Sequence, residues 1–252
     1  MQSIERFALT VFLSLATVAS STAALGAPAS EFAPAPLFGF RLGLAKPFGE
    51  FGAATNVQDA LPNDKVSNVT SNVVPLGLEL GFQATPMLAV GGFFDYGFGV
   101  VADSGDMSCS STIECSVRDV TLGLHATIHL PVASSVRPWV TVGASYEWLS
   151  VEATGPGGAS FGGQTLTAVV TYSGFHFLDL GLGFDFPLSQ YFQGGPFLAV
   201  DIGQFSSTRY EAKVAGNTQH LDVDLNAKQM HGWVLLGFRI RTDLSSAGSH
   251  RT

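Results

Sequence analysis

The sequence has 252 residues, and 12 lysines and arginines against 20 aspartates and glutamates give a formal net charge of −8 at pH 7. The negative charge argues against nucleic-acid binding, which needs a basic surface, and a hydrophobic content of 46% argues against a disordered chain. Charged residues make up only 13%, about half their usual share, yet no apolar run beyond the N-terminus approaches the roughly 18 residues of a membrane helix.

The N-terminus (residues 1–26) has the layout of a secretory signal peptide. The apolar stretch Phe7–Ala19 is followed by small residues that offer cleavage positions after Ala23 or Gly26. An uncleaved anchor helix is the alternative, because neither the stretch nor the small residues behind it carry a charge. Residues 27–36 are rich in proline and alanine and are interpreted as a linker. We therefore expect an exported protein.

From residue 37 to residue 244 the sequence repeats one pattern, in which bulky apolar residues alternate with glycine, small or charged residues. In the first segment Phe40 and Leu42 fall on one face, and Arg41 and Gly43 fall on the other. Strict alternation predicts a β-strand with two unlike faces, and about ten residues is the length of a tilted membrane strand. The segments with this pattern are 37–45, 76–83, 88–99, 119–130, 140–148, 178–186, 198–203 and 234–241.

The two faces are the reverse of those in a soluble β-sandwich. A uniform face of Leu, Val and Phe suits lipid, whereas glycine with isolated charges suits a narrow lumen whose opposite walls supply ionic partners. Closing the sheet removes the edges that lipid would leave unpaired. We therefore predict an all-β fold, an eight-stranded antiparallel up-and-down transmembrane β-barrel. A soluble β-sandwich or a barrel with a ligand in its lumen is the alternative.

The connections between the segments alternate in length, as do the short periplasmic turns and longer extracellular loops of membrane barrels. The short connections are 84–87, 131–138 and 187–195. The long connections are 46–72, 101–118, 154–173 and about 206–229. An even number of strands would leave both termini in the periplasm. The long loops are rich in Ser, Thr, Gly, Asn and Asp, and we expect any surface partner to be contacted through them.

Aromatic residues near the predicted strand ends indicate two girdles at the membrane interfaces. An aromatic core is the alternative. Those toward the short turns are Phe38, Phe82, Trp139, Phe184 and Phe186. Those toward the long loops are Tyr96, Phe98, Tyr146, Trp148 and Tyr172.

Two cysteines, Cys109 and Cys115, lie close together in a polar segment. In an exported protein this spacing predicts a disulfide, with two free thiols as the alternative. The chain-entropy model gives roughly 2 kcal/mol of stabilisation for so short a ring.

With these features the chain resembles the small eight-stranded outer-membrane barrels of Gram-negative bacteria, described as porin-like or as opacity- or OmpW-type. Residues 39–47 (GFRLGLAKP) resemble their opening strand and first bend, and residues 237–240 (GFRI) resemble their closing strand. The resemblance covers about residues 37–244 and implies a location in the outer membrane, among its lipid and lipopolysaccharide, with no cofactor. It departs at the C-terminus, where a polar tail (245–252) replaces the family's terminal aromatic residue.

Ten charged residues fall on the predicted lumen face. They are Arg41, Glu79, Asp95, Asp119, Glu147, Asp179, Asp185, Asp201, Arg239 and Arg241. Arg41 adjoins Glu79 on the neighbouring strand, and Arg239 is expected to reach Asp201 or Asp179. We predict a structural network of salt bridges. The alternative is a narrow, cation-preferring water path, which the excess of acids favours.

Three further patterns bear on catalysis or metal binding. Residues 158–162 (GASFG) match the G-x-S-x-G nucleophile motif, but they lie in a glycine-rich loop rather than between a strand and a helix. His125 and His129 share a face but would lie about 13 Å apart along a strand, so no shared metal is expected. His176 near Ser173 has a location that suits a lipid-modifying enzyme, but no other motif supports one.

The sequence therefore predicts an integral outer-membrane barrel over residues 37–244 that is not an enzyme, holds no metal and binds no nucleic acid. Its expected role is structural or one of surface interaction. A narrow channel for ions or small apolar solutes is the alternative, and a lipid-modifying enzyme at the barrel rim is a more remote one.

Overall fold

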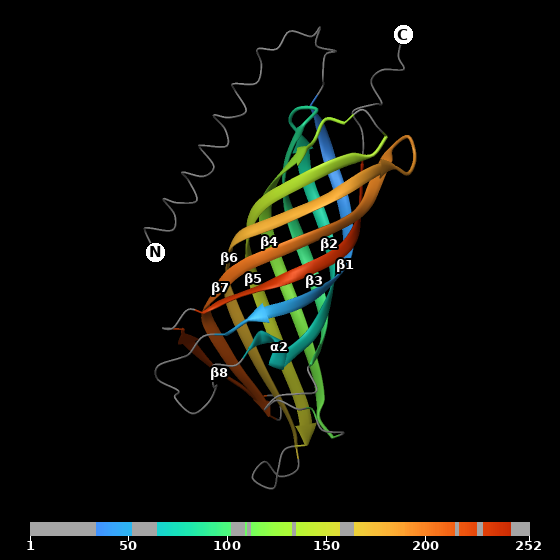
Figure 1. Cartoon of the computed structure of the whole chain (residues 1–252). Coiled ribbons are helices and arrows are strands. Elements are labelled where there is room, and N and C mark those ends of the chain that lie inside the picture. Colours follow the sequence, from blue (N-terminus) through green and yellow to red (C-terminus); the bar gives the residue numbers. More distant parts are fainter. Residues whose placement is uncertain are drawn as a thin grey trace. The chain divides into compact units, whose positions relative to one another are not determined.

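The alternating segments fold into an antiparallel β-sheet that closes on itself (Figure 1). The computed structural model describes residues 34–51, 65–101, 109, 112–132, 135–156, 164–214, 217–225 and 229–242. The elements in these ranges are β1 (Ala35–Gly49), α2 (Val66–Val69), β2 (Thr70–Gln83), β3 (Leu88–Val101), β4 (Glu114–His129), β5 (Arg137–Pro156), β6 (Thr165–Pro187), β7 (Phe192–Val214), β8 (Asn217–Asp224) and β9 (Met230–Thr242).

The chain divides into two units, Met1–Ala33 and Pro34–Thr252, and the barrel belongs to the second. The predicted signal peptide and C-terminal tail lie outside the described residues, and so does most of the predicted linker. Within the described ranges, no helix has the length and apolar character needed to cross a membrane.

The ring closes between the first and last strands of the barrel. Neighbouring strands follow the order β6-β5-β4-β3-β2-β1-β9-β7, and β7 pairs again with β6. β1 meets β9 from Gly39, opposite Arg241, to Gly49, opposite His231. The pairs of the ring are all antiparallel. The predicted eight-stranded antiparallel up-and-down β-barrel is thus confirmed.

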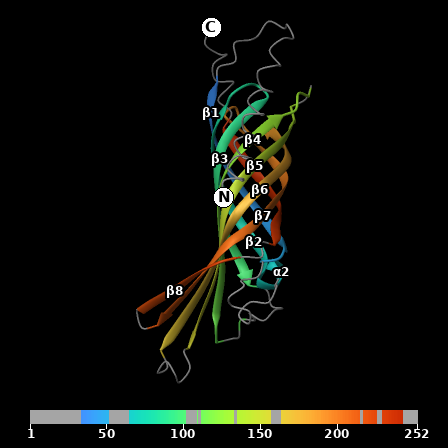
Figure 2. The same cartoon turned by 90° about the vertical axis from the view of Figure 1, so that its left-hand side faces the viewer.

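The eighth strand of the ring consists of two pieces. β7 pairs with β9 as far as Gln204 and with β8 from Ser207 onwards, so β8 and β9 lie along the same edge of β7. Between the pieces, the backbone N–H of Leu225 donates to the carbonyl of Ser206 at 3.1 Å, and its side chain is buried. Figure 2 shows β8 leaning away from the barrel wall together with the ends of the strands beside it.

Two of the predicted long loops are largely strand, which corrects the loop assignments of 154–173 and 206–229. β5 continues to Pro156 and β6 begins at Thr165, while β7 continues to Val214. The regular apolar alternation ends here, because polar residues such as Ser150, Thr167 and Thr171 are mixed with apolar ones. Hydroxyl contacts between strands join these parts of the sheet. The hydroxyl pairs are Ser150–Thr171, Thr154–Thr167 and Ser173–Ser207.

The outer face of the barrel is covered by bulky apolar side chains. Leu80 and Leu236 are 65% and 64% exposed, and every strand of the ring contributes similar residues. Soluble proteins rarely expose apolar patches beyond a few hundred Å², so this belt fits hydrocarbon rather than water. Its members include Phe40, Leu42, Leu78, Phe94, Leu122, Leu124, Val140, Leu180, Leu182, Leu198 and Phe238.

A bulge in β6 reverses which residues face the lumen. His176 lies opposite Gly203 of β7 while Leu178 lies opposite Ile202, so Phe177 is an extra residue in β6. The pairing of β6 with β5 shows the same shift. Because an extra residue breaks the alternation, Phe177 faces outward, 46% exposed, and His176 faces inward.

Two residues assigned to the aromatic girdles, Trp139 and Tyr172, are buried inside the barrel, so their assignment is wrong. Trp139 lies in phase with Thr141, which lines the lumen. Tyr172 lies beyond the bulge at Phe177, where even-numbered residues of β6 turn inward.

The lumen is blocked at the end that carries the long connections by a group of side chains called here the apolar plug. Helix α2 contributes two buried valines to it. The ring of Phe51 lies 4.2 Å from that of Tyr172 and 5.6 Å from that of Phe205, measured between centroids. The plug consists of Phe51, Val66, Val69, Leu149, Tyr172, Phe205 and Leu225.

Candidate functional site

The ten charged residues assigned to the lumen lie inside the barrel. Eight of them are buried, namely Glu79, Asp95, Asp119, Glu147, Asp179, Asp185, Arg239 and Arg241. The other two, Arg41 and Asp201, line an internal cavity. Most of these side chains belong to three groups along the lumen.

The first group surrounds Arg41. Its Nε donates to Asp95 Oδ1 at 2.8 Å, its Nη2 donates to Asp95 Oδ2, and its Nη1 lies 3.7 Å from Glu79 Oε1. Glu79 was the expected partner, whereas Asp95 lies one strand further along the sheet. Gly77 of β2 leaves room for the contact between Arg41 and Asp95, because a Cβ added there would collide with both side chains. The guanidinium also lies 4.4 Å above the ring of Phe93.

The second group lies toward the short turns and centres on Asp185. Arg239 donates to it from Nε at 3.0 Å and from Nη2 at 2.7 Å, and Arg241 Nε lies 3.2 Å away. The prediction that Arg239 pairs with Asp201 or Asp179 is wrong. The register explains this, since the residue opposite Arg239 on β7 is Gly195. Because Gly195 has no side chain, the guanidinium can extend across β7 to Asp185 on β6.

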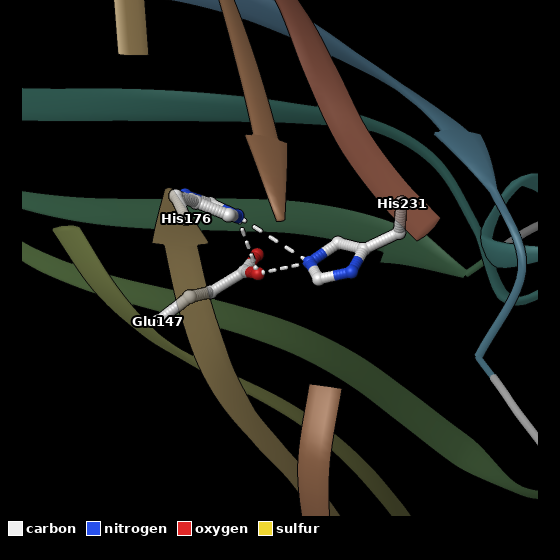
Figure 3. A group of neighbouring side chains, drawn as sticks. All are labelled: Glu147, His176 and His231. Atoms are coloured by element: carbon white, nitrogen blue, oxygen red, sulfur yellow. Dashed lines mark hydrogen bonds and ion pairs between the residues drawn. The ribbon is translucent and has the colours of Figure 1, made fainter. Parts of the chain in front are cut away.

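The third group consists of Glu147 of β5, His176 of β6 and His231 of β9 (Figure 3). Glu147 Oε2 lies 2.9 Å from His176 Nε2 and 2.7 Å from His231 Nε2. The two imidazole nitrogens lie 3.3 Å apart. All three side chains are fully buried, so a carboxylate and two imidazoles converge on one point without access to bulk water.

Neighbouring side chains hold these three in place. Trp233 Nε1 donates to the other carboxylate oxygen of Glu147 at 2.7 Å. Ser145 Oγ lies 3.2 Å from His176 Nδ1, and Asp179 Oδ1 lies 3.8 Å from the same nitrogen. The ring of His231 stacks on Phe205 of the apolar plug, with 3.6 Å between centroids and 6° between planes.

Local backbone features bring the two histidines together. Gly203 of β7 lies opposite His176 on β6 and opposite His231 on β9. Because Gly203 has no side chain, the two imidazoles can approach each other across it. A Cβ at Gly203 would collide with the His176 ring. On β5, Ser145 lies opposite His176, and Glu147 is the next inward-facing residue.

Only part of this group follows from the sequence. Alternation places Glu147 in the lumen, but it places His176 at the outer rim beside Ser173, whose hydroxyl in fact contacts Ser207 at 2.8 Å. His176 is inside the barrel, which removes the basis for a lipid-modifying site at the rim. His231 was missed because it precedes the segment 234–241, although extending that alternation back through Trp233 would have turned it inward.

The two histidines of β4 lie apart from this group. His125 stacks on Phe93, with 5.5 Å between ring centroids, and His129 is buried in β4. The GASFG motif lies outside the described residues. The predicted disulfide between Cys109 and Cys115 is present, with 6.2 Å between the Cα atoms.

A small cavity lies in the lumen between the first two groups. Its volume is about 40 Å³, and its lining includes Arg41, His125, Asp201 and Arg239. Such a volume holds a few water molecules at most. The buried side chains of the apolar plug lie beyond it, toward the long connections.

One charged pair lies outside the barrel wall, on the hairpin of β7 and β8. Arg209 Nε donates to Asp222 Oδ1 at 2.6 Å, and both side chains are more than half exposed. The hydrogen bond from Arg209 holds the pKa of Asp222 below its usual value of 3.8. The hairpin is therefore fastened by a solvent-exposed ion pair.

The site has two chemical interpretations. Ser145, His176 and Glu147 are connected like a nucleophile, a base and an acid, but Ser145 is only 2% exposed. The ligand atoms of Glu147, His176 and His231 lie within 4.8 Å of one another, and two imidazoles with a carboxylate form a donor set that transition metals accept.

No protein-family model and no curated protein matches the chain. Several solved structures do. A major outer membrane protein from Thermus thermophilus shares 18% identity over 82% of this chain and 99% of its own, with a TM-score of 0.48. The outer membrane protein AlkL shares 15% identity over 86% and 94%, with a TM-score of 0.42. OprG from Pseudomonas aeruginosa shares 13% over 82% and 96%, with a TM-score of 0.41.

Proposed function

We propose that this chain is an integral outer-membrane β-barrel with a closed lumen, whose role is structural or one of surface interaction. It has the architecture of the small eight-stranded outer-membrane barrels, with an apolar outer face and an interior of paired charges. In this role the barrel anchors the chain in lipid, and the strand extensions of β5, β6, β7 and β8 form the part that meets a partner.

The filled lumen is the observation that carries the proposal. Ion pairs occupy its middle and its short-turn end, and the apolar plug fills the other end. An eight-stranded barrel has room for little more than its own side chains. A route for solute would have to displace Phe51, Tyr172 and Phe205, which pack against one another.

The strand extensions support a surface role. Beyond Gln204 the sheet continues for ten residues of β7 and is joined by β8, whose residues are nearly all exposed. Extending paired strands past the membrane belt has no use for anchoring, since the belt is already complete on every strand of the ring. We infer that the extension is a surface on which a partner docks.

A narrow channel for ions or small apolar solutes is the second candidate. The cavity of about 40 Å³ and the excess of acids over arginines in the lumen favour it. Under this interpretation the plug would be displaced during transport, and cations would be preferred.

Recording current across a planar lipid bilayer separates the two candidates. The closed barrel predicts no stable conductance steps from the purified, refolded protein. Steps that are cation-selective in the unchanged protein and altered in Arg41→Ala would overturn the proposal in favour of a channel. Phe205→Ala serves as the plug variant, since conductance that arises only there supports closure by the plug.

The surface role is tested by inserting an epitope tag between Val214 and Asn217, at the end of the β7 and β8 hairpin. The proposal predicts that an antibody binds the tag on intact cells. Binding only after the outer membrane has been permeabilised would place the extension in the periplasm and contradict the proposal.

A further inference from the structure

We propose that Glu147, His176 and His231 form a binding site for one divalent transition-metal ion, with zinc as the ion that the donor set fits best. The site lies inside the barrel beneath the apolar plug, so its role is to stabilise the fold rather than to catalyse a reaction. The inference is independent of the proposed function, because a closed barrel needs no metal.

The geometry of the three ligand atoms is the first argument. In a tetrahedral zinc site with bonds of about 2.0–2.1 Å, neighbouring ligand atoms lie roughly 3.3 Å apart. The two imidazole nitrogens already lie 3.3 Å apart, and the Glu147 oxygen lies 2.9 and 2.7 Å from them. The oxygen would withdraw by roughly half an ångström to admit the ion. Three ligands come from three strands, and the fourth position is left for water.

The surrounding hydrogen bonds are the second argument. A metal-bound imidazole usually donates its other N–H to an oxygen, which fixes the ring and its tautomer. Ser145 Oγ is placed for this at 3.2 Å from His176 Nδ1, with Asp179 Oδ1 nearby at 3.8 Å. Trp233 holds the second oxygen of Glu147, which leaves Oε2 as a single-atom ligand. Stacking on Phe205 sets the plane of His231.

The distribution of charge around the site is the third argument. Among the described residues, four lumen carboxylates form no ion pair with an arginine or lysine, namely Asp119, Glu147, Asp179 and Asp201. Asp119 lies beside Glu147, and Asp179 lies opposite Asp201 in the sheet. Buried carboxylates need compensating positive charge. A divalent cation held by Glu147 and the two histidines would supply it where the arginines do not.

Burial determines how the ion would enter and leave. Because the plug covers His231, the ion would bind as the barrel folds and would then exchange slowly with a chelator. Binding requires both Nε2 atoms to be unprotonated, with their protons on Nδ1 or released to solvent, so loading should weaken in acid. The protein should therefore be refolded with zinc present rather than soaked afterwards.

The test is refolding of the full chain in detergent with ZnCl₂, removal of loosely held metal by dialysis against a chelator, and elemental analysis. The proposal predicts about one zinc per chain. His231→Gln and Glu147→Gln should lose this zinc, and Ser145→Ala should bind it about tenfold more weakly, as expected for loss of a supporting hydrogen bond. Two histidine variants outside the site, His129→Gln and His220→Gln, should retain full occupancy.

X-ray absorption of the unchanged, zinc-loaded protein keeps the test decisive if a variant does not fold. Scattering from two imidazoles and one or two oxygens around the zinc is the expected result. The proposal is overturned if the folded, unchanged protein retains no zinc, if His231→Gln folds and retains as much zinc as the unchanged protein, or if His129→Gln or His220→Gln abolishes retention.

Discussion

The guanidinium carbon of Arg239 lies 3.4 Å from the centroid of the Trp139 ring, inside the barrel near the short turns. The aromatic face supports the cation from one side, while Asp185 accepts two of its hydrogen bonds. Arg241 shares the same carboxylate. Two buried arginines therefore share one buried carboxylate, and we expect the integrity of this end of the lumen to depend on it.

Replacing that acid should be costly. Asp185→Asn removes the carboxylate that Arg239 and Arg241 share, and breaking a buried ion pair typically costs about 3–5 kcal/mol. The free energy of unfolding, measured by urea titration of the barrel in lipid vesicles with tryptophan fluorescence, should fall by about this amount. Asp222→Asn, in the exposed pair with Arg209, should leave the midpoint unchanged. Equal shifts in the two variants would contradict the dependence on burial.

Gly77 should resist substitution more than Gly92, a glycine on the outer face of β3, does. A Cβ at Gly77 would collide with Arg41 and Asp95, whereas a Cβ at Gly92 would meet its nearest neighbours at 3.4 and 3.5 Å, which is ordinary contact. Gly77→Ala should therefore destabilise the barrel by about 1–3 kcal/mol, as overpacking does. Gly92→Ala should change the urea midpoint little, and a loss as large as that of Gly77→Ala would refute the role assigned to Gly77.

The hairpin of β7 and β8 should loosen in acid. The hydrogen bond from Arg209 lowers the pKa of Asp222 below 3.8. The ion pair therefore stabilises the hairpin at pH values above 3.8, and this stabilisation is lost as the pH falls through the lowered pKa. Titration of the Asp222 carboxyl carbon by NMR should show this lower pKa. In Arg209→Gln the pKa should rise toward 3.8. The same value in both proteins would show that the ion pair does not form in solution.

Reducing the disulfide should weaken the fold modestly without opening the barrel. Cys115 belongs to β4, where it lies opposite Ala153 of β5, so the strand pairing survives without the covalent link. The chain-entropy model predicts a loss of about 2 kcal/mol for this short ring. Urea unfolding with and without dithiothreitol measures it, and Cys109→Ser should reproduce the reduced protein. Failure of Cys109→Ser to fold would mean that the link is needed for assembly.

Much of the fold follows from the sequence, because lipid and a filled lumen impose strict alternation on the strands. Phe40, Leu80 and Leu236 face outward as the alternation requires. The pattern fails where the strands leave the apolar belt, since neither face there has to be apolar, and β8 consequently escaped prediction. Its residues 217–224 lie in a segment interpreted as a loop.

The candidate site was harder to predict, because it depends on features that period-two reasoning does not contain. The bulge at Phe177 turns His176 inward, although the alternation of the predicted strand 178–186 would turn it outward. Partners of arginines also depend on register, and the glycines at positions 77 and 195 decide which carboxylate each guanidinium reaches. Sequence alternation gives the face of a residue but not its height along the lumen.

The extra residue in β6 means that backbone pairing, not only residue identity, sets the chemistry of the lumen. If β6 kept all its residues but paired without the bulge, alternation from Asp179 would turn Phe177 and Phe175 inward and His176 and Tyr172 outward. Deleting Phe177 would also restore unbroken alternation, but it would place His176 two positions from Asp179 and keep both side chains in the lumen. The bulge thus lets β6 hold one residue more than regular pairing allows while His176 and Asp179 both face inward.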